Sequence, residues 1–181
     1  MLDETSQQLR DFTLRYCRRW QQDRQSAPVN EQLIGVDSPC LLTTNENGIT
    51  WQPQPFTLAK NLDAVSKGVD LVLQPSVVAF YTTQFAAEMT AIFEGMPLTL
   101  LQAWNEEDFT LLQQNLVGHL VMKRRLKHSP TLFIATTEED STIIAVDNLA
   151  GNVILEVLGK NQNKILAPSL SDFLQALHPQ V

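Results

Sequence analysis

The sequence is poor in the residues on which cofactor and metal sites are usually built. Its seven glycines form neither GxGxxG nor GxxxxGKS/T, the patterns in which a glycine-rich loop holds phosphate groups. Its two cysteines, Cys17 and Cys40, stand 23 positions apart and form no CxxC pair. We therefore expect no cofactor and no metal site, and we expect both cysteines to be reduced thiols.

Positive charge and long apolar runs are also scarce. The chain carries 13 Lys and Arg residues against 20 Asp and Glu residues, which gives a formal net charge of −7 and a pI of about 4.9. Binding to nucleic acid needs a basic surface, so this balance argues against nucleic acid and favours basic partners. The longest apolar runs, such as residues 76–80, are far too short to cross a bilayer, and the first residues lack a basic segment followed by an apolar one. We therefore expect a cytosolic protein.

Residues able to do acid–base chemistry are present, but their positions favour structural roles. The histidines, His119, His128 and His178, include no pair at the i, i+4 spacing of helical metal ligands. His119 lies among apolar side chains of a predicted helix, which is more typical of a packed histidine than of a catalytic base. The acids at 106–108 fall in the first turn of that helix, where carboxylates favour the dipole. We predict no enzymatic activity, and a hydrolase with a hidden site is the enzyme hypothesis left open.

Apolar periodicity predicts a first helix over about residues 4–24. Thr5 and Gln8 could form a capping box at its start. Aromatic residues opposite arginines would also suit a helix lying on a membrane surface. The segment is close to neutral, however, so we interpret its apolar stripe as core packing. Four side chains at helical spacing form this stripe: Leu9, Phe12, Tyr16 and Trp20.

The middle of the chain predicts two hairpins and further helical segments. Alternating runs at 40–44 and 48–51 flank a polar turn at 45–47, and a second pair of runs, 88–93 and 98–102, flanks a Gly/Pro turn at 94–97. Between the hairpins, helical spacing extends from Leu58 to Val72, and a second short helix or turn follows Pro75. The sequence thus mixes hairpins with helices and shows no βαβ alternation.

The second half predicts a long helix, a meander and a final short helix. Asn105 is a good N-cap for the long helix, whose buried stripe is Phe109, Leu112, Leu116 and Leu120. Strand-like runs at 131–136, 142–147 and 152–157 indicate an antiparallel meander, and residues 169–177 indicate the last helix. We therefore predict the α+β class, with one domain over residues 1–181 and a mostly antiparallel sheet flanked by helices.

The stretch WQPQPF, residues 51–56, cannot be part of a regular helix because its prolines alternate with glutamines. A proline-rich docking peptide would be repeated and would have charged, low-complexity flanks, whereas this stretch occurs once beside a predicted hairpin. We interpret it as an extended crossing that places Trp51 and Phe56 in or beside the core. Gln52 and Gln54 are candidates to face a binding groove, and a structural corner without partner contact is the alternative.

Charge is distributed unevenly along the chain. From Val36 to Gly118 there are nine carboxylates and two lysines, a local balance of −7. Such an excess is either a solvated face or a field that recruits basic loops, and composition leaves both open. The basic tract at 123–128 resembles a nucleic-acid patch, but its place at a helix C-terminus gives it a dipole role. Four acids are our partner-binding candidates: Asp63, Asp70, Glu88 and Glu94.

Six motifs occur in order over nearly the whole chain: YC at 16–17 with Trp20, WQPQPF at 51–56, FYTTQF at 80–85, LLQ at 100–102 with Trp104, NLVGHL at 115–120 and PTLFIAT at 130–136. Together they resemble the Syd family of SecY-interacting proteins. The resemblance implies an α+β domain related to the SUKH superfamily and no enzymatic activity. It also implies a cytosolic protein held loosely at the inner membrane through its partner.

The partner implied by this resemblance is SecY, a subunit of the SecYEG translocon. The cytoplasmic loops of SecY are rich in Lys and Arg, and the family's binding surface is an acidic concave groove. The implied role is to monitor or restrain improperly assembled translocase. A SUKH-like immunity protein, or a generic interaction protein for another basic partner, is the alternative. The motifs are mostly aromatic and apolar, so they do not say which carboxylates line the groove.

Overall fold

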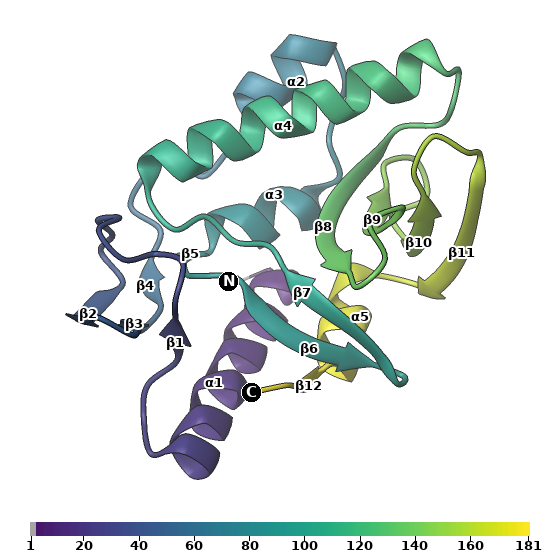
Figure 1. Cartoon of the computed structure of the whole chain (residues 1–181). Coiled ribbons are helices and arrows are strands. Elements are labelled where there is room, and N and C mark those ends of the chain that lie inside the picture. The colour runs from purple at the N-terminus through teal and green to yellow at the C-terminus, as the bar shows by residue number, and fades with distance from the viewer. Residues whose placement is uncertain (1–2) are drawn as a thin grey trace.

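The chain folds around a seven-stranded sheet (Figure 1). The computed structural model describes residues 3–181. The strand order is β11-β10-β9-β8-β7-β6-β12, and every neighbouring pair is antiparallel. The predicted α+β class with a mostly antiparallel sheet is therefore confirmed. The strands are β6 (Met89–Phe93), β7 (Met96–Leu100), β8 (Thr131–Thr137), β9 (Thr142–Asp147), β10 (Val153–Val157), β11 (Gln162–Ala167) and β12 (His178–Pro179).

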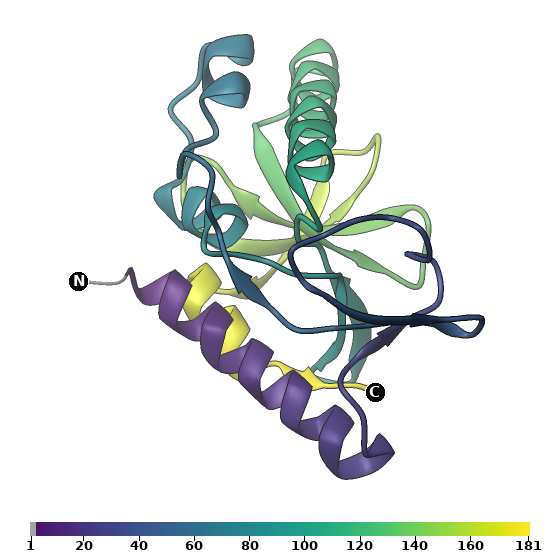
Figure 2. The ribbon, with the colours of Figure 1, turned by 90° about the vertical axis from the view of Figure 1, so that its left-hand side faces the viewer.

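The helices form two groups, one in the lower and middle part of the view in Figure 2 and one at its top. In the first group, α1 (Glu4–Arg24) packs against α3 (Pro75–Thr82) and α5 (Leu170–Ala176), and α3 also contacts α5. In the second group, α2 (Asp63–Val69) packs against α4 (Glu106–Arg125), and α4 also contacts β8. The expected short helix after Pro75 and the final helix are thus confirmed.

The apolar stripe of α1 lies in the protein interior. Leu9, Phe12 and Tyr16 are buried, and Trp20 packs against the same core while partly exposed. The predicted extent of the helix and its core-packing role are confirmed. The stripe is therefore not free to lie on a membrane surface.

The start of α1 differs from the prediction. Asp3 is the N-cap, and its Oδ2 atom accepts a hydrogen bond from the backbone N–H of Thr5 at 2.9 Å. The predicted capping box of Thr5 and Gln8 is wrong, because Thr5 lies inside the first turn with its side chain buried. The acceptor needed at this helix end is supplied by the carboxylate that precedes the helix.

The first predicted hairpin is confirmed as β2 (Leu41–Asn45) and β3 (Gly48–Trp51). The other edge of β3 pairs with β1 (Val29–Asn30), a strand too short to leave a pattern in the sequence. Gly48 has φ 147°, and a Cβ atom there would lie 2.8 Å from the carbonyl oxygen of Asn30. Only glycine allows β1 to approach β3 this closely.

The WQPQPF stretch is framework at both of its ends. Gln54 and Pro55 form β4, which pairs antiparallel with β5 (Gln84–Phe85). Trp51 and Phe56 are only 1% and 5% exposed, as predicted. The prolines thus fix an extended crossing whose two ends are anchored in the core.

The turn of the second hairpin is tighter than predicted. Glu94 and Gly95 have φ values of 46° and 83°, and Phe93 pairs directly with Met96. Positive φ at both central residues is typical of the two-residue turns that match the twist of a hairpin. Pro97 therefore already belongs to β7, although the sequence had placed it in the turn.

The second helix is shorter than the apolar spacing from Leu58 to Val72 had predicted. Only Asp63–Val69 is helical, Asp70 ends the helix in the left-handed conformation, and Val72 is 91% exposed. The segment that follows is held by Asn148, whose Nδ2 donates to the carbonyl oxygen of Val72 at 3.0 Å. A tertiary contact distant in sequence, rather than apolar periodicity, sets the backbone here.

The meander is confirmed and has one more strand than predicted. β8, β9 and β10 match the three predicted runs, and β11 adds the edge of the sheet. Four of the six β11 residues are exposed. A strand without a buried face lacks the alternation by which strands are recognised, which explains why it was missed.

The long helix α4 begins with two reciprocal hydrogen bonds. The side chain of Asn105 accepts from the backbone N–H of Asp108, and Oδ2 of Asp108 accepts from the backbone N–H of Trp104, both at 2.8 Å. Phe109, Leu116 and Leu120 are buried as predicted. The N-cap prediction is confirmed, and Asp108 additionally fixes the chain before the helix.

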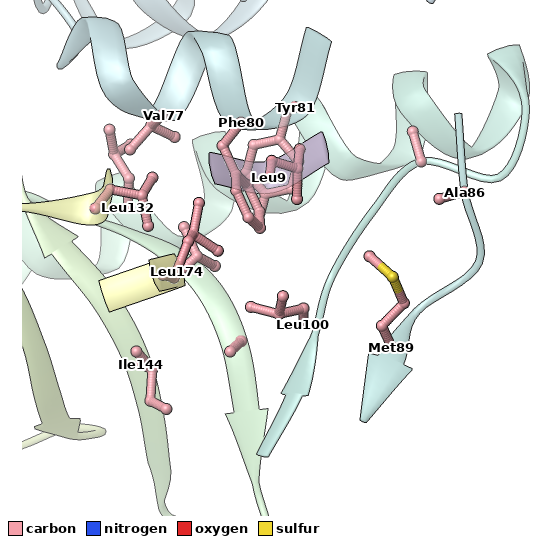
Figure 3. Packing of buried hydrophobic residues seen from close by; sticks show 14 of the residues in the cluster. Leu9, Val77, Phe80, Tyr81, Ala86, Met89, Leu100, Leu132, Ile144 and Leu174 are labelled. Carbon is pink, nitrogen blue, oxygen red and sulfur yellow. The ribbon is translucent and has the colours of Figure 1, made fainter. Parts of the chain in front are cut away.

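Helices and sheet share one hydrophobic core (Figure 3). Leu9 of α1, Phe80 of α3, Leu100 of β7 and Leu174 of α5 are all fully buried in it. Tyr81 is buried as well, and its hydroxyl donates to the carbonyl oxygen of Phe133 at 2.6 Å. This bond ties α3 to β8 and satisfies a polar group that would be costly to bury alone.

Candidate acidic binding surface

A cleft of about 290 Å³ lies between α4 and the segments that lead out of β5 and β7. One wall is the face of α4 that carries Leu111, Leu112 and Asn115. The other residues that line it are Asn30, Gln32, Leu33, Ala86, Ala87, Glu88, Leu101, Gln102, Trp104, Asp108 and Phe133. We call this hollow the α4 cleft. Its walls are largely apolar, with two carboxylates and no Lys, Arg or His.

Trp104, at the start of α4, is buried and hydrogen-bonded to the segment 36–38. Its ring is 3% exposed, and its Nε1 donates to the carbonyl oxygen of Val36 at 3.0 Å. Its own carbonyl oxygen accepts from the hydroxyl of Ser38 at 2.6 Å. These bonds fasten residues 36–38 to the N-terminus of α4, although they lie far apart in sequence.

The two carboxylates of the cleft repel each other. Burial raises the pKa of Glu88, and the negative charge of Asp108 raises it further. The Glu88 residue as a whole is exposed, but its carboxyl is partly shielded where it lines the cleft, which is why burial acts on its pKa. Asp108 is half-buried. Among residues 3–181, neither carboxylate has a salt-bridge partner. The site therefore holds two carboxylates that have no ion-pair partner within the described chain.

A second, wider hollow of about 760 Å³ adjoins the α4 cleft. It is lined by residues 35–39, Leu41 and residues 105–107, and Nδ2 of Asn105 donates to the carbonyl oxygen of Asp37 at 2.8 Å. The junction of Trp104 with Val36 and Ser38 separates the two hollows. We call the combined region the acidic surface and define it by its five carboxylates, Asp37, Glu88, Glu106, Glu107 and Asp108.

The structure does not bring the four predicted acids together. Glu88 belongs to the acidic surface, but Asp63 and Asp70 line a separate hollow of about 490 Å³ on α2, where Lys67 offsets part of their charge. Glu94 sits in the β6–β7 turn. Figure 1 shows α2 and this turn at opposite ends of the molecule. The candidates therefore mark three places rather than one groove.

The two predicted glutamines lie beside the acidic surface without lining either hollow. Gln52 is exposed, and its backbone N–H donates to the carbonyl oxygen of Cys40, just after Ser38 and Pro39 in the wider hollow. Gln54 is half-buried in β4. Of the two, Gln52 has the more accessible side chain.

The acids at the start of α4 were interpreted from the sequence as serving the helix dipole. Glu106, Glu107 and Asp108 have the predicted place in the first helical turn. Glu106 and Glu107 are exposed in the wider hollow, so a role at the dipole leaves their carboxylates available to a partner. Asp37 was not a candidate from the sequence, because its place beside these acids depends on the contact of Val36 with Trp104. No local pattern signals that contact.

A buried polar cluster lies at the other end of α4. Nζ of Lys123 donates to Oε1 of Glu156 at 3.1 Å, and the hydroxyl of Thr131 donates to the same oxygen at 2.8 Å. Nε2 of His119 lies 2.9 Å from that hydroxyl oxygen. Because the Thr131 proton is directed at Glu156, we assign the proton of His119 to Nε2. His119 is therefore a packed histidine with structural partners.

Cys17 and Cys40 are free thiols. Burial raises the pKa of Cys17 to about 11, so its reactive thiolate form is scarce at neutral pH. The part of the chain that the structure describes contains no group of three His, Cys, Asp or Glu residues arranged to hold a metal ion.

Comparison with known proteins assigns the chain to a family. The sequence model of the family described as Syd protein (SUKH-2) matches residues 6–179. The chain belongs to the Syd family. Protein Syd of Erwinia tasmaniensis is 55% identical over 181 residues, covering 100% of this chain and 97% of the relative. Protein Syd of Escherichia coli O157:H7 is 51% identical over 179 residues, covering 99% of both chains, and that of Escherichia fergusonii is 52% identical over 179 residues, covering 98% of this chain and 99% of the relative.

The motifs that resembled the Syd family are chiefly core residues. Trp51, Phe80, Tyr81, Trp104 and Leu116 are all 3% exposed or less. Membership in the Syd family thus confirms the resemblance and explains the fold. The motifs do not include the carboxylates of the acidic surface. We chose those carboxylates because they line the two hollows.

Proposed function

We propose that this Syd-family chain is a non-enzymatic binding protein that docks on the basic cytoplasmic loops of SecY. In this proposal the acidic surface receives the loops. The chain thereby monitors or restrains translocase that is improperly assembled. The observation that carries the proposal is the pair of adjoining hollows with five carboxylates and no basic side chain.

Charge complementarity supports this choice of partner. Asp37, Glu88 and Glu107 come from three separate segments that the contacts of Trp104 bring to one region. Fields of one sign focused in a hollow raise the local concentration of oppositely charged groups and steer their approach. Loops rich in Lys and Arg have the charge that this surface lacks.

The proposal also includes the place where the protein acts. No helix among residues 3–181 combines the length and apolarity needed to span a bilayer. The net charge of −7 opposes direct attachment to anionic lipid. The chain is then cytoplasmic and reaches the inner membrane only through SecY.

The second candidate is a SUKH-like immunity or interaction protein for another basic partner. The acidic surface supports it equally, because charge alone does not choose between basic proteins. The likeness to proteins called Syd over the whole chain favours SecY.

Affinity capture from detergent-solubilised inner membranes tests the two candidates. The tagged full-length chain is used as bait, and the triple variant Glu88→Gln, Glu106→Gln, Glu107→Gln is the matched comparison. Recovery of SecY by the wild-type chain, with a loss in the triple variant, supports the proposal. Recovery of a soluble basic protein in place of SecY would favour the second candidate. A triple change of exposed acids away from the surface, Glu138→Gln, Glu139→Gln and Asp140→Asn, controls for net charge.

A further inference from the structure

We propose that the α4 cleft is a side-chain pocket that accepts one arginine of the basic partner. This inference rests on the proposed function, whose acidic surface includes the cleft. It adds the chemical identity of the anchoring group. The inference also gives the two hollows different roles. The α4 cleft would hold a single side chain, and the wider hollow would attract the rest of the loop.

The size and lining of the cleft suit a long amphipathic side chain. Its volume of about 290 Å³ is at the lower limit of pockets that hold small molecules, which are about 300–1,000 Å³. Leu111, Leu112 and Leu101 provide apolar walls, and the carboxylates of Glu88 and Asp108 lie in the same lining. Arginine buries its aliphatic stem along apolar surface while its charged head reaches polar groups. An anionic side chain would meet repulsion, and an apolar one would leave both carboxylates unpaired.

The hydrogen-bond state of the carboxylates leaves room for a donor. Asp108 accepts from the backbone N–H of Trp104 through Oδ2, and no hydrogen bond from residues 3–181 reaches its Oδ1. Glu88 accepts no side-chain or backbone hydrogen bond within the same described region. Its raised pKa follows from burial and from Asp108, and a cation placed between the two would reverse that repulsion. The cleft thus has one carboxylate on α4 and one on the segment before β6, and no donor from the described residues joins them.

Arginine suits this arrangement better than lysine. Its guanidinium presents five N–H donors in a planar fork that binds carboxylates bidentately, whereas a lysine ammonium is a compact point charge that holds its water strongly. The oxygens offered here come from Glu88 and Asp108, and the amides of Asn30, Gln32 and Asn115 also line the cleft. A planar fork of five donors can bind more of these acceptors at once than a single ammonium can.

The test uses the full-length chain labelled with ¹⁵N and four capped tripeptides. The probes are acetyl-Gly-Arg-Gly-amide, its lysine counterpart, its citrulline counterpart, which keeps the shape of arginine without the charge, and acetyl-Gly-Ala-Gly-amide. We expect the arginine peptide to shift the indole N–H signal of Trp104 and the side-chain amide signal of Asn115 in a saturable way. The lysine peptide should bind at least several-fold more weakly, and the citrulline and alanine peptides should cause no saturable shift.

Two variants test whether the arginine peptide binds at Glu88. Glu88→Gln removes the carboxylate and should weaken arginine-peptide binding about tenfold, as expected for loss of one charged hydrogen bond. Glu138→Gln makes the same change of charge on an exposed turn and should leave binding unchanged. Equal affinities for arginine and lysine peptides, shifts scattered over the surface, or an unchanged affinity in Glu88→Gln would each overturn the arginine pocket.

The same variants distinguish a failure of the arginine pocket from a failure of the proposed function. Arginine-peptide binding that is lost in Glu88→Gln, in a chain that never recovers SecY, would retain the pocket and reject SecY as the partner. Recovery of SecY at the wild-type level by Glu88→Gln would retain the partner and reject the arginine anchor.

Discussion

Lys123 and Glu156 form an ion pair, with 3.1 Å between Nζ and Oε1, in which both side chains are almost completely shielded from water. The sequence had suggested that Lys123 serves the helix dipole with the other cations after it. It instead turns inward from the last turns of α4 and joins that helix to β10. Buried pairs of this kind stabilise only as pairs, because each charge is costly to bury alone.

Replacing one partner should therefore be far more damaging than replacing both. Lys123→Met is expected to lower the free energy of unfolding by about 3–5 kcal/mol, since it leaves the Glu156 carboxylate buried without its lysine partner. The double variant Lys123→Met, Glu156→Leu should recover most of that loss. Urea titration of the three proteins measures both effects, and Lys164→Met on the exposed β11 should change stability by less than about 0.5 kcal/mol. Similar losses in single and double variants would show that packing, and not charge, holds the site.

His119 should make stability depend on pH in the weakly acidic range. Burial lowers its pKa below the usual 6.5, and Lys123 lowers it further against the opposing effect of Glu156. Between the lowered pKa and 6.5 the unfolded chain binds a proton that the folded chain does not, so folding stability must fall as pH falls through this window. Unfolding free energies measured from pH 7.5 to 5 should show this slope in the wild type and a reduced slope in His119→Gln. The exposed His178→Gln serves as control, and an equal slope in all three proteins would contradict the assignment.

Trp51 should contribute strongly to the stability of the folded core. Its ring is 1% exposed and lies 6.3 Å from the ring of Tyr16, centroid to centroid. Trp51→Ala should cost about 3–5 kcal/mol through lost burial and the cavity left behind. Thermal and urea unfolding measure the cost, and Val72→Ala, at a side chain that is 91% exposed, should have almost no effect. A nearly unchanged melting curve together with loss of SecY capture would move Trp51 from the framework to the contact surface.

Those parts of the fold that depend on local pattern could be predicted from the sequence. The stripe of α1, the cap at Asn105 and both predicted hairpins follow from periodicity and turn chemistry, and each was confirmed. The exceptions have physical causes. β11 has no buried face to produce alternation, and the segment around Val72 takes its shape from Asn148, which is 76 residues away.

The candidate site could be predicted less well, because it is a property of tertiary structure. Charge counting along the chain identified an acidic region but could not tell which acids share a face. Glu88 and Asp108 come together because α4 packs beside the segment between β5 and β6, whereas Asp63 faces another hollow with Lys67. The family motifs did not help, since they record core packing.

Membrane association should require a protein partner. The apolar stripe of α1 is occupied by the core, and the chain is acidic overall, so nothing favours binding to an anionic bilayer. Flotation with protein-free anionic liposomes should leave the chain in the soluble fraction, whereas vesicles that contain SecY should carry it upward. Flotation with lipid alone would show that α1 can leave the core and act as an anchor.

The last prediction concerns how charge acts during binding to SecY. If the acidic surface attracts basic loops, its field is screened over about 8 Å at physiological ionic strength and over about 3 Å near 1 M salt. Affinity should therefore fall as salt rises, with the association rate falling more than the dissociation rate rises. Kinetics of binding to immobilised SecYEG at several salt concentrations give both rates.

Charge reversals at single positions then separate a local surface from the overall field. Glu88→Lys and Glu107→Lys should weaken binding and flatten its salt dependence, because each removes attraction where the loops would dock. Glu138→Lys changes the net charge by the same two units on a remote turn and should have little effect. Asp63→Lys, Asp70→Lys and Glu94→Lys test whether the hollow on α2 or the β6–β7 turn also contributes. Equal losses at every position would mean that only the net charge of −7 matters. Binding that ignores all the reversals and persists at high salt would mean that the contact is apolar, and the carboxylates around Trp104 would then be a solvated face.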